Sequence, residues 1–235
     1  MVIRKNIDQH MAELKDWLDT VKDQPPEAMD AFFTARIDGY EAHMQIWAAA
    51  YRRFAQLLPK VPGNVLDLGV GTGLELDEIW AIDPTIPVTG VDMCRAMLDL
   101  LAEKHRDKAL TLICDDYFRY DMGQEKWDTV ISFESFHHFL HPEKMDLYRK
   151  ICRGLKPGGY LLLGDYIACC DEEEELLREV YLLKRQQYAV PAGQFIHMDI
   201  PMTLEHETAI LREAGFRTVT PLDSIDGATI LLATK

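Results

Sequence analysis

The chain has 235 residues, of which 48% are hydrophobic and 27% charged, a composition typical of a globular domain with a sizeable core. Its 25 Lys and Arg residues are outnumbered by 39 Asp and Glu residues, so the formal net charge is −14. This excess of acid argues against nonspecific binding to nucleic acid or to anionic membranes, because both need clustered basic side chains. The apolar runs have the length of strands and are too short to span a bilayer.

The five cysteines form no CxxC pair and no other metal-binding spacing. An odd number of thiols without a disulfide framework is typical of proteins from a reducing compartment. The first residues contain no apolar targeting segment either. We therefore expect a cytoplasmic protein, either a monomer or a homodimer.

The first sixty residues have a helical pattern. Apolar residues at steps of three and four predict an amphipathic helix that ends at the two prolines 25 and 26. A short second helix is expected over about 27–37, and a third apolar stripe predicts a helix over about 44–58. Together these elements predict a helical cap over residues 1–60.

From residue 64 onward, short apolar strands alternate with amphipathic helices. Strands are expected at 65–68, 88–91, 110–114, 129–133 and 160–164, the last one after a turn at 156–159. The helices between them are expected at about 74–80, 95–105 and 142–155. Two further helices, 171–189 and 203–214, enclose a loop, and strands at 217–220 and 228–233 close the chain. This alternation predicts an α/β protein with a doubly wound, mostly parallel sheet.

Three alternate glycines, Gly69, Gly71 and Gly73, directly follow the first of these strands. Without a Cβ atom the backbone can turn sharply and approach a ligand, and the next helix offers free N–H groups. The spacing is not the GxGxxG of dinucleotide-binding enzymes, because leucines stand at positions 74 and 76, and there is no Gly-Lys-Ser/Thr of an ATP loop. A nicotinamide-dependent oxidoreductase is therefore disfavoured.

Acidic residues end the next two strands. Asp92 ends the second strand, where a carboxylate over the crevice can accept hydrogen bonds from both hydroxyls of a ribose. Asp115 and Asp116 end the third strand, where they can contact the amine or the edge of a base. The glycine loop and these acids together predict a nucleoside-binding crevice.

The motifs and their order resemble those of the class I S-adenosylmethionine-dependent methyltransferases. Residues 65–73, VLDLGVGTG, are similar to that family's glycine motif, and Gly90-Val91-Asp92 is similar to its ribose-binding acid. Further similarities are found at 114–116, at 127–131 and at 155–160. The resemblance implies a seven-stranded sheet whose last hairpin places one antiparallel strand inside. It also implies a cofactor-binding domain over 61–235 with a substrate-covering insertion at 171–202.

The resemblance implies S-adenosylmethionine as the cofactor and S-adenosylhomocysteine as the product. Asp67 would order the glycine loop and the amino group of the cofactor, Met93 would lie against the adenine, and Tyr40 would close over the cofactor from the cap. The full predicted cofactor site is Tyr40, Asp67, Gly69, Gly71, Gly73, Asp92, Met93, Asp115, Asp116 and Phe133.

The stretch FESFHHFLH, residues 133–141, follows the fourth strand and is expected beside the methyl group. Glu134, His137 and His138 are the candidate catalytic residues, because a histidine can act as a general base near neutral pH. One of the two histidines can equally pack between sheet and helix. A base is needed only where the nucleophile must lose a proton, so an oxygen, nitrogen or carbon acceptor on a small molecule stays open.

Two alternatives remain at the level of sequence. If Glu134, His137 and His138 lie on one helical face, they resemble the metal-binding residues of O-methyltransferases in quinone biosynthesis and would suit a divalent transition metal. The chain would then be a metal-assisted O-methyltransferase. The other alternative is a protein that binds the cofactor or a partner without catalysing any reaction.

Overall fold

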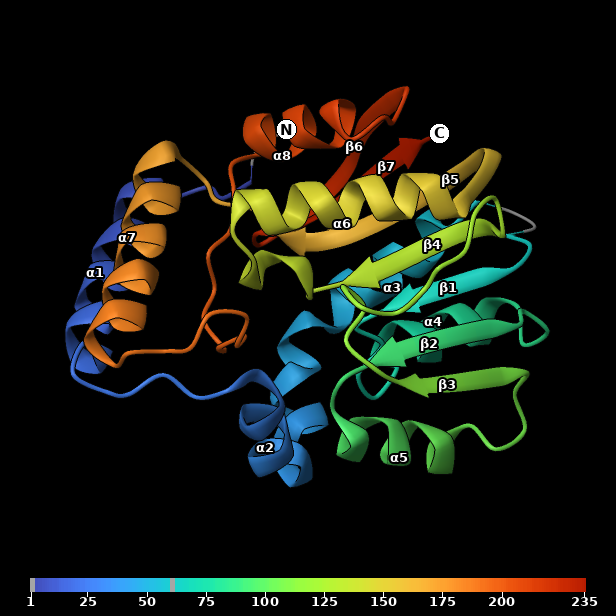
Figure 1. Cartoon of the computed structure of the whole chain (residues 1–235), viewed down its shortest axis with the longest axis horizontal. Coiled ribbons are helices and arrows are strands. Elements are labelled where there is room, and N and C mark those ends of the chain that lie inside the picture. The colour runs from blue at the N-terminus through green and yellow to red at the C-terminus, as the bar shows by residue number, and fades with distance from the viewer. Residues whose placement is uncertain (1–2, 60–61) are drawn as a thin grey trace.

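The computed structural model describes residues 3–59 and 62–235. Within these residues, seven strands form a sheet in the order β3-β2-β1-β4-β5-β7-β6 (Figure 1). The strands are β1 (Val65–Leu68), β2 (Val88–Asp92), β3 (Leu110–Cys114), β4 (Trp127–Phe133), β5 (Leu155–Tyr166), β6 (Thr218–Ile225) and β7 (Ala228–Thr234). β7 lies between β5 and β6 and is antiparallel to both, whereas β1 to β5 pair in parallel. The predicted doubly wound sheet with one antiparallel strand in its last hairpin is confirmed.

The helices agree with the predicted order, with differences at their ends. They are α1 (Ile7–Val21), α2 (Met29–Met44), α3 (Ala48–Leu57), α4 (Leu74–Ile82), α5 (Arg95–Lys104), α6 (His141–Gly154), α7 (Asp171–Gln187) and α8 (Leu204–Glu213), with short 3₁₀ helices η1 (Gln45–Trp47) and η2 (Phe136–His138). α2 extends to Met44 rather than to about residue 37, because an isolated glycine such as Gly39 destabilises a helix by only about 1 kcal/mol. The predicted turn at 156–159 lies inside β5, where its pairing with β4 shifts register.

The sheet is covered on both faces. Apolar side chains of α6 and α8 pack on one face, and those of α3, α4 and α5 pack on the other. All four residues of β1 are buried. This explains why its sequence is a short, mostly apolar run and not an alternation of apolar and polar residues. Phe54 of α3 lies against Phe133 of β4, so the last helix of the predicted cap packs directly on the sheet.

The carboxyl ends of the parallel strands point toward α1, α2 and α7 (Figure 1). There, α1 and α7 lie side by side, although they are far apart in the sequence. They are held to the loop that follows α7 by one apolar cluster, which consists of Leu18, Leu177, Tyr181, Ile196, Met198 and Ile200. The predicted boundary between cap and domain, at residues 60 and 61, lies outside the described residues. In the part of the chain that the structure describes, no helix is long and apolar enough to cross a membrane.

Candidate active site

The glycine loop connects β1 to α4 and needs its glycines for two reasons. Gly69, Gly71 and Gly73 all have left-handed backbone angles, with φ of 76°, 50° and 72°. A Cβ at Gly69 would collide with the side chain of Ser135, and one at Gly73 would collide with Leu101. A Cβ at Gly71 would meet only the hydroxyl of Tyr40, at 4.0 Å. The middle of the loop therefore faces open space.

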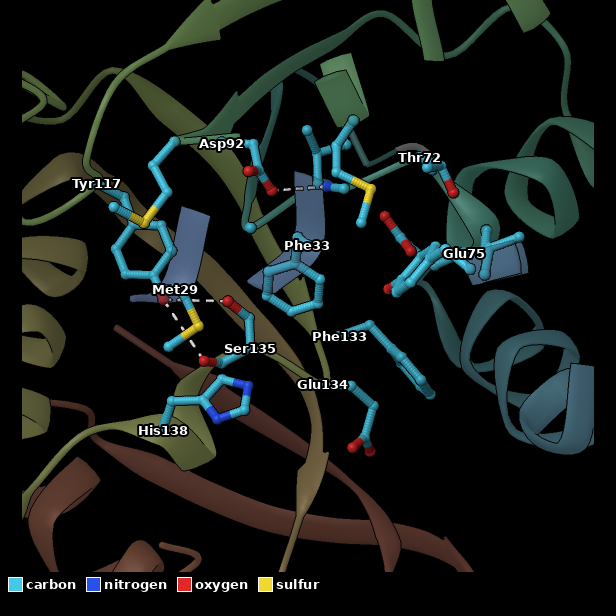
Figure 2. Close-up of a pocket in the computed structure, with 18 of the residues that line it drawn as sticks. Met29, Phe33, Thr72, Glu75, Asp92, Tyr117, Phe133, Glu134, Ser135 and His138 are labelled. Atoms are coloured by element: carbon cyan, nitrogen blue, oxygen red, sulfur yellow. Dashed lines mark hydrogen bonds between the residues drawn. The ribbon is translucent and has the colours of Figure 1, made fainter. Parts of the chain in front are cut away.

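That space is a cavity at the carboxyl edge of the sheet (Figure 2). It is lined by eleven of the thirteen predicted site residues: Tyr40, Gly69, Gly71, Gly73, Asp92, Met93, Asp115, Asp116, Phe133, Glu134 and His138. The two that do not line it are Asp67, which is fully buried, and His137, which faces a second cavity. The wall also contains residues that the sequence did not single out for this site, among them Met29, Glu75 and Tyr117.

The carboxylate of Asp92 is fixed at the end of β2 beside the glycine loop. Its Oδ2 accepts a hydrogen bond of 2.9 Å from the backbone N–H of Gly71, and its Oδ1 accepts one of 2.8 Å from Cys94. Burial raises the pKa of Asp92 above its ordinary value, while both N–H donors oppose that rise. The strand end and the loop thus hold one carboxylate at the crevice, where the sequence expected a ribose.

Two buried carboxyl groups lie beneath and beside the loop. Both oxygens of Asp67 and the Oε1 of Glu75 have no hydrogen-bond partner among the described residues. Burial raises the pKa of Glu75 to about 7, and burial together with Glu75 raises that of Asp67 well above its ordinary value. Buried carboxyls without partners are costly unless a cation or donor reaches them. The α-amino group of S-adenosylmethionine is such a cation, so the residues present fit this cofactor.

A second, larger cavity adjoins the first. Its wall is largely aromatic, with Phe32, Trp47, Tyr166 and His197 among the lining residues. The rings of Phe32 and His197 are stacked at 3.4 Å, and the guanidinium of Arg36 lies 3.7 Å from the centroid of Phe32. Four residues line both cavities: Phe33, Tyr40, Glu134 and His138.

Glu134 stands at the junction of the two cavities in a strained conformation. Its φ of 50° is unusual for a residue with a side chain, and its N–H donates to the carbonyl of Gly164 at 2.7 Å. Burial raises the pKa of its carboxyl to about 8, while the charge of His137 opposes the rise. The strained turn directs the chain from β4 into η2, which carries the two histidines.

The two adjacent histidines are in different electrostatic environments. His137 Nδ1 lies 2.7 Å from Oδ1 of Asp165, and its Nε2 lies 3.4 Å from Asp199. Burial alone would lower the pKa of His137, but these two carboxylates outweigh it and raise the pKa well above its ordinary value. Burial and the charge of His137 lower the pKa of His138 well below its ordinary value. These shifts favour the charged imidazolium of His137 and the neutral imidazole of His138.

Hydrogen bonding also fixes the tautomer of His138. Its Nδ1 lies 3.2 Å from the carbonyl oxygen of Met198, which can only accept, so Nδ1 carries the proton. In a neutral imidazole the Nε2 atom is then left with a free lone pair. This arrangement gives the wall shared by the two cavities an unprotonated base.

The predicted metal-binding trio is not brought together around one point. Among the described residues, the ligand atoms of His137 lie within 4.8 Å of those of Glu134 and Asp165 in one group, and of those of His138 and Asp199 in another. Neither group contains both Glu134 and His138. The reason is that Glu134 lies before η2 in a left-handed conformation rather than within a helix shared with the histidines.

Residues 65–159 match the family of methyltransferase domains. This match includes the glycine loop and Asp92, and the strand order agrees with it. Residues 65–159 therefore form a methyltransferase domain, and in its motifs and strand order the chain is similar to the class I S-adenosylmethionine-dependent methyltransferases.

Two curated relatives illustrate the similarity in sequence. The 27-O-demethylrifamycin SV methyltransferase of Amycolatopsis mediterranei is 32% identical over 142 residues, which cover 54% of this chain and 50% of that protein. An uncharacterized methyltransferase of Geobacillus is 27% identical over 130 residues, covering 55% and 60% of the two chains. The chain thus spans only about half to three fifths of the length of these relatives.

Two solved structures share the fold. Human N-acetylserotonin methyltransferase, in complex with S-adenosylmethionine, has a TM-score of 0.65 at 21% identity, covering 98% of this chain and 66% of that one. The O-methyltransferase family 2 protein of Planctomyces limnophilus, in complex with apigenin, has a TM-score of 0.65 at 22% identity, covering 88% and 62%. At these identities the likeness establishes the fold of the chain.

Proposed function

We propose that this protein transfers the methyl group of S-adenosylmethionine to a hydroxyl oxygen of a small, planar acceptor. The observation that carries the proposal is the wall that the two cavities share, formed by Phe33, Tyr40, Glu134 and His138. Methyl transfer is an in-line displacement, and most of its acceleration comes from holding donor and acceptor in contact and aligned. Adjacent cavities with a common wall provide that alignment.

The first cavity is assigned to the cofactor. The glycine loop would lie under its methionine part, with Glu75 receiving the amino group and Asp67 buried behind it. Asp92 would accept the ribose hydroxyls. Met93, Asp115 and Asp116 would contact the adenine, and Phe133 and Tyr40 would lie toward the sulfonium. When bound, S-adenosylmethionine supplies a methyl group on a positively charged sulfur, which a nucleophile can accept directly.

The second cavity is assigned to the acceptor. Its aromatic lining, which includes Phe33, Trp47 and Tyr166, suits a flat ring that can stack on these side chains. The relatives support an oxygen nucleophile. One is named as an O-demethylrifamycin methyltransferase, and one fold neighbour is an O-methyltransferase crystallised with apigenin.

His138 is assigned as the general base. Its lone pair on Nε2 would accept the hydroxyl proton while the oxygen–methyl bond forms and the sulfur–methyl bond breaks. The charged His137, held by Asp165, would keep η2 in place and keep His138 neutral. The helices of 1–60 and the segment 171–202 would close over the acceptor, since the loop after α7 brings His197 and Asp199 to this cavity.

Calorimetric titration with S-adenosylmethionine and S-adenosylhomocysteine tests the first cavity, and we expect both to bind. Release of S-adenosylhomocysteine in the presence of a panel of phenols and hydroxylated polycyclic compounds then tests the second. Failure of both nucleosides to bind would overturn the proposal. Binding without turnover of any acceptor would favour the non-catalytic alternative, and turnover that stops with a chelator would favour metal assistance.

A further inference from the structure

A second cluster of chemically active side chains lies away from the two cavities. It joins His10 of α1, Cys169 in the segment between β5 and α7, and Glu173 in the first turn of α7. One ligand atom from each of these three lies within 4.8 Å of the others. The Sγ of Cys170 lies 3.9 Å from that of Cys169 but does not belong to this group. We propose that His10, Cys169 and Glu173, with water as the fourth ligand, bind a zinc ion that fastens α1 to the start of α7.

The donor set and its spacing are those that zinc prefers. Thiolate, imidazole and carboxylate ligands occur together in tetrahedral zinc sites, with zinc–sulfur bonds of about 2.3 Å and zinc–nitrogen and zinc–oxygen bonds of about 2.0–2.2 Å. His10 Nε2 and Glu173 Oε1 are 2.6 Å apart and hydrogen-bonded. They must separate by less than about 1 Å to admit the ion.

Burial and supporting hydrogen bonds also suit a metal. The side chain of Glu173 is fully buried, whereas that of His10 is 19% exposed, so an ion can enter from the solvent on the helix α1 side. The Glu173 carboxylate is held by two donors outside the cluster of ligand atoms. The backbone N–H of Cys169 donates to its Oε2 at 2.6 Å, and the hydroxyl of Tyr166 donates to its Oε1. Such outer hydrogen bonds orient ligands in known metal sites.

Zinc binding would replace hydrogen bonds of the Glu173 carboxylate by bonds to the metal. Without an ion, Glu173 is balanced by His10 and by the donors from Tyr166 and Cys169. With zinc bound, the Cys169 thiol releases its proton as the thiolate forms, and the imidazole of His10 turns a lone pair to the metal. Charge then stays balanced, because the divalent ion is matched by one thiolate and one carboxylate.

The position of the site gives it a structural consequence. α1 and α7 lie side by side (Figure 1), and their apolar contacts also hold the residues Ile196, Met198 and Ile200 of the following loop. That loop carries His197 and Asp199 to the wall of the second cavity. A zinc ion at the end of this helix pair would therefore stabilise the cover of the second cavity. The site itself does not depend on the proposed methyl transfer.

Cobalt(II) is the probe that tests this site, since thiolate-bound cobalt absorbs strongly in the near ultraviolet while cobalt on nitrogen and oxygen ligands does not. Full-length protein, stripped of metal by chelation and kept reduced, is titrated with cobalt chloride. We expect a thiolate-to-cobalt band that saturates at one ion per chain and disappears when zinc chloride is added. Saturating zinc should also raise the Tm by about 5–10 °C.

Variants locate the ion. Cys169→Ser should abolish the band and the zinc-induced rise in Tm, and His10→Ala should weaken cobalt binding by at least tenfold. Cys114→Ser is the matched control, because Cys114 is an exposed thiol on β3 outside the cluster, and it should leave the band unchanged. Circular dichroism establishes that each variant is folded. A wild-type titration without the band, or a band that persists in Cys169→Ser, overturns the proposal.

Discussion

His137 and Asp165 form a buried pair, with Nδ1 and Oδ1 only 2.7 Å apart, and the ring of His138 lies 4.1 Å from that of His137. The carboxylate keeps His137 charged, and this charge lowers the pKa of the neighbouring His138. Asp199 lies within 3.4 Å of both rings, so the two adjacent histidines differ in protonation because only His137 also pairs with the fully buried Asp165.

Replacing His138 by Gln should remove the proposed base while keeping a polar side chain of similar size. We expect kcat to fall by about 100-fold or more, since general-base catalysis typically contributes 10²–10⁴-fold. The affinity for S-adenosylhomocysteine should stay within about twofold. Initial rates with the acceptor found by the screen, and calorimetry, measure the two quantities. His206→Gln is a suitable control, because His206 is half-exposed on α8; an unchanged kcat in His138→Gln would rule out the role.

Because the pKa of His138 is lowered well below 6.5, the base stays unprotonated as the pH falls from 8 to 6.5. At saturating cofactor, we expect no loss of kcat across this range. A pH–rate profile measures it. A rate that falls with an apparent pKa near 6.5 would instead indicate an ordinary solvent-exposed histidine as the base.

Asp92→Asn tests the ribose contact. The variant keeps the shape of the side chain but loses the charge that holds the N–H groups of Gly71 and Cys94 and would accept the ribose hydroxyls. Hydrogen bonds to charged groups are worth about 1.5–3 kcal/mol, so the Kd for S-adenosylhomocysteine should rise by about 10- to 100-fold. Asp99→Asn, an exposed position on α5, should bind as the wild type does. Equal affinity in both variants would place the nucleoside elsewhere.

Glu75→Gln should separate stability from cofactor binding. The pKa of Glu75 in the folded protein, about 7, lies above its ordinary 4.5. The stability that the buried neutral carboxyl contributes is therefore fully present below pH 4.5 and is lost as the pH rises through 7. At pH 8 the glutamine avoids this loss, so the ligand-free variant should be more stable, by up to about 3 kcal/mol.

The same Glu75→Gln variant should bind S-adenosylmethionine at least tenfold more weakly, because the amino group loses a charged partner. Urea denaturation at pH 5 and pH 8 measures stability, and calorimetry measures affinity. A variant that is destabilised at pH 8, or that binds the cofactor with unchanged affinity, would contradict the assignment of Glu75.

The buried ion pair of Lys144 and Glu207 should contribute more to the free energy of unfolding than an exposed ion pair does. Lys144 Nζ lies 2.5 Å from Oε2 of Glu207, both side chains are fully buried, and the hydroxyl of Tyr148 donates to the same carboxylate. Lys144→Met leaves this carboxylate without its cation and should lower the free energy of unfolding by about 3–5 kcal/mol. Lys22→Met, which breaks an exposed pair with Asp19, should cost less than about 1 kcal/mol. Similar losses in the free energy of unfolding of the two variants would contradict the expected difference between a buried and an exposed ion pair.

The sequence alone determined the strands, their alternation with helices and the glycine loop with Asp92. These features depend on short runs of residues, such as the buried VLDL of β1 and the left-handed glycines that follow it, and local geometry suffices to recognise them. The tertiary structure alone decided the partners of the catalytic candidates. Asp165, Asp199 and Met198 reach the two histidines from other segments, and Glu75 faces the cofactor cavity from a helix that carried no separate signal. Which histidine is charged depends on burial and on carboxylates distant in the sequence, and neither quantity is fixed until the chain has packed.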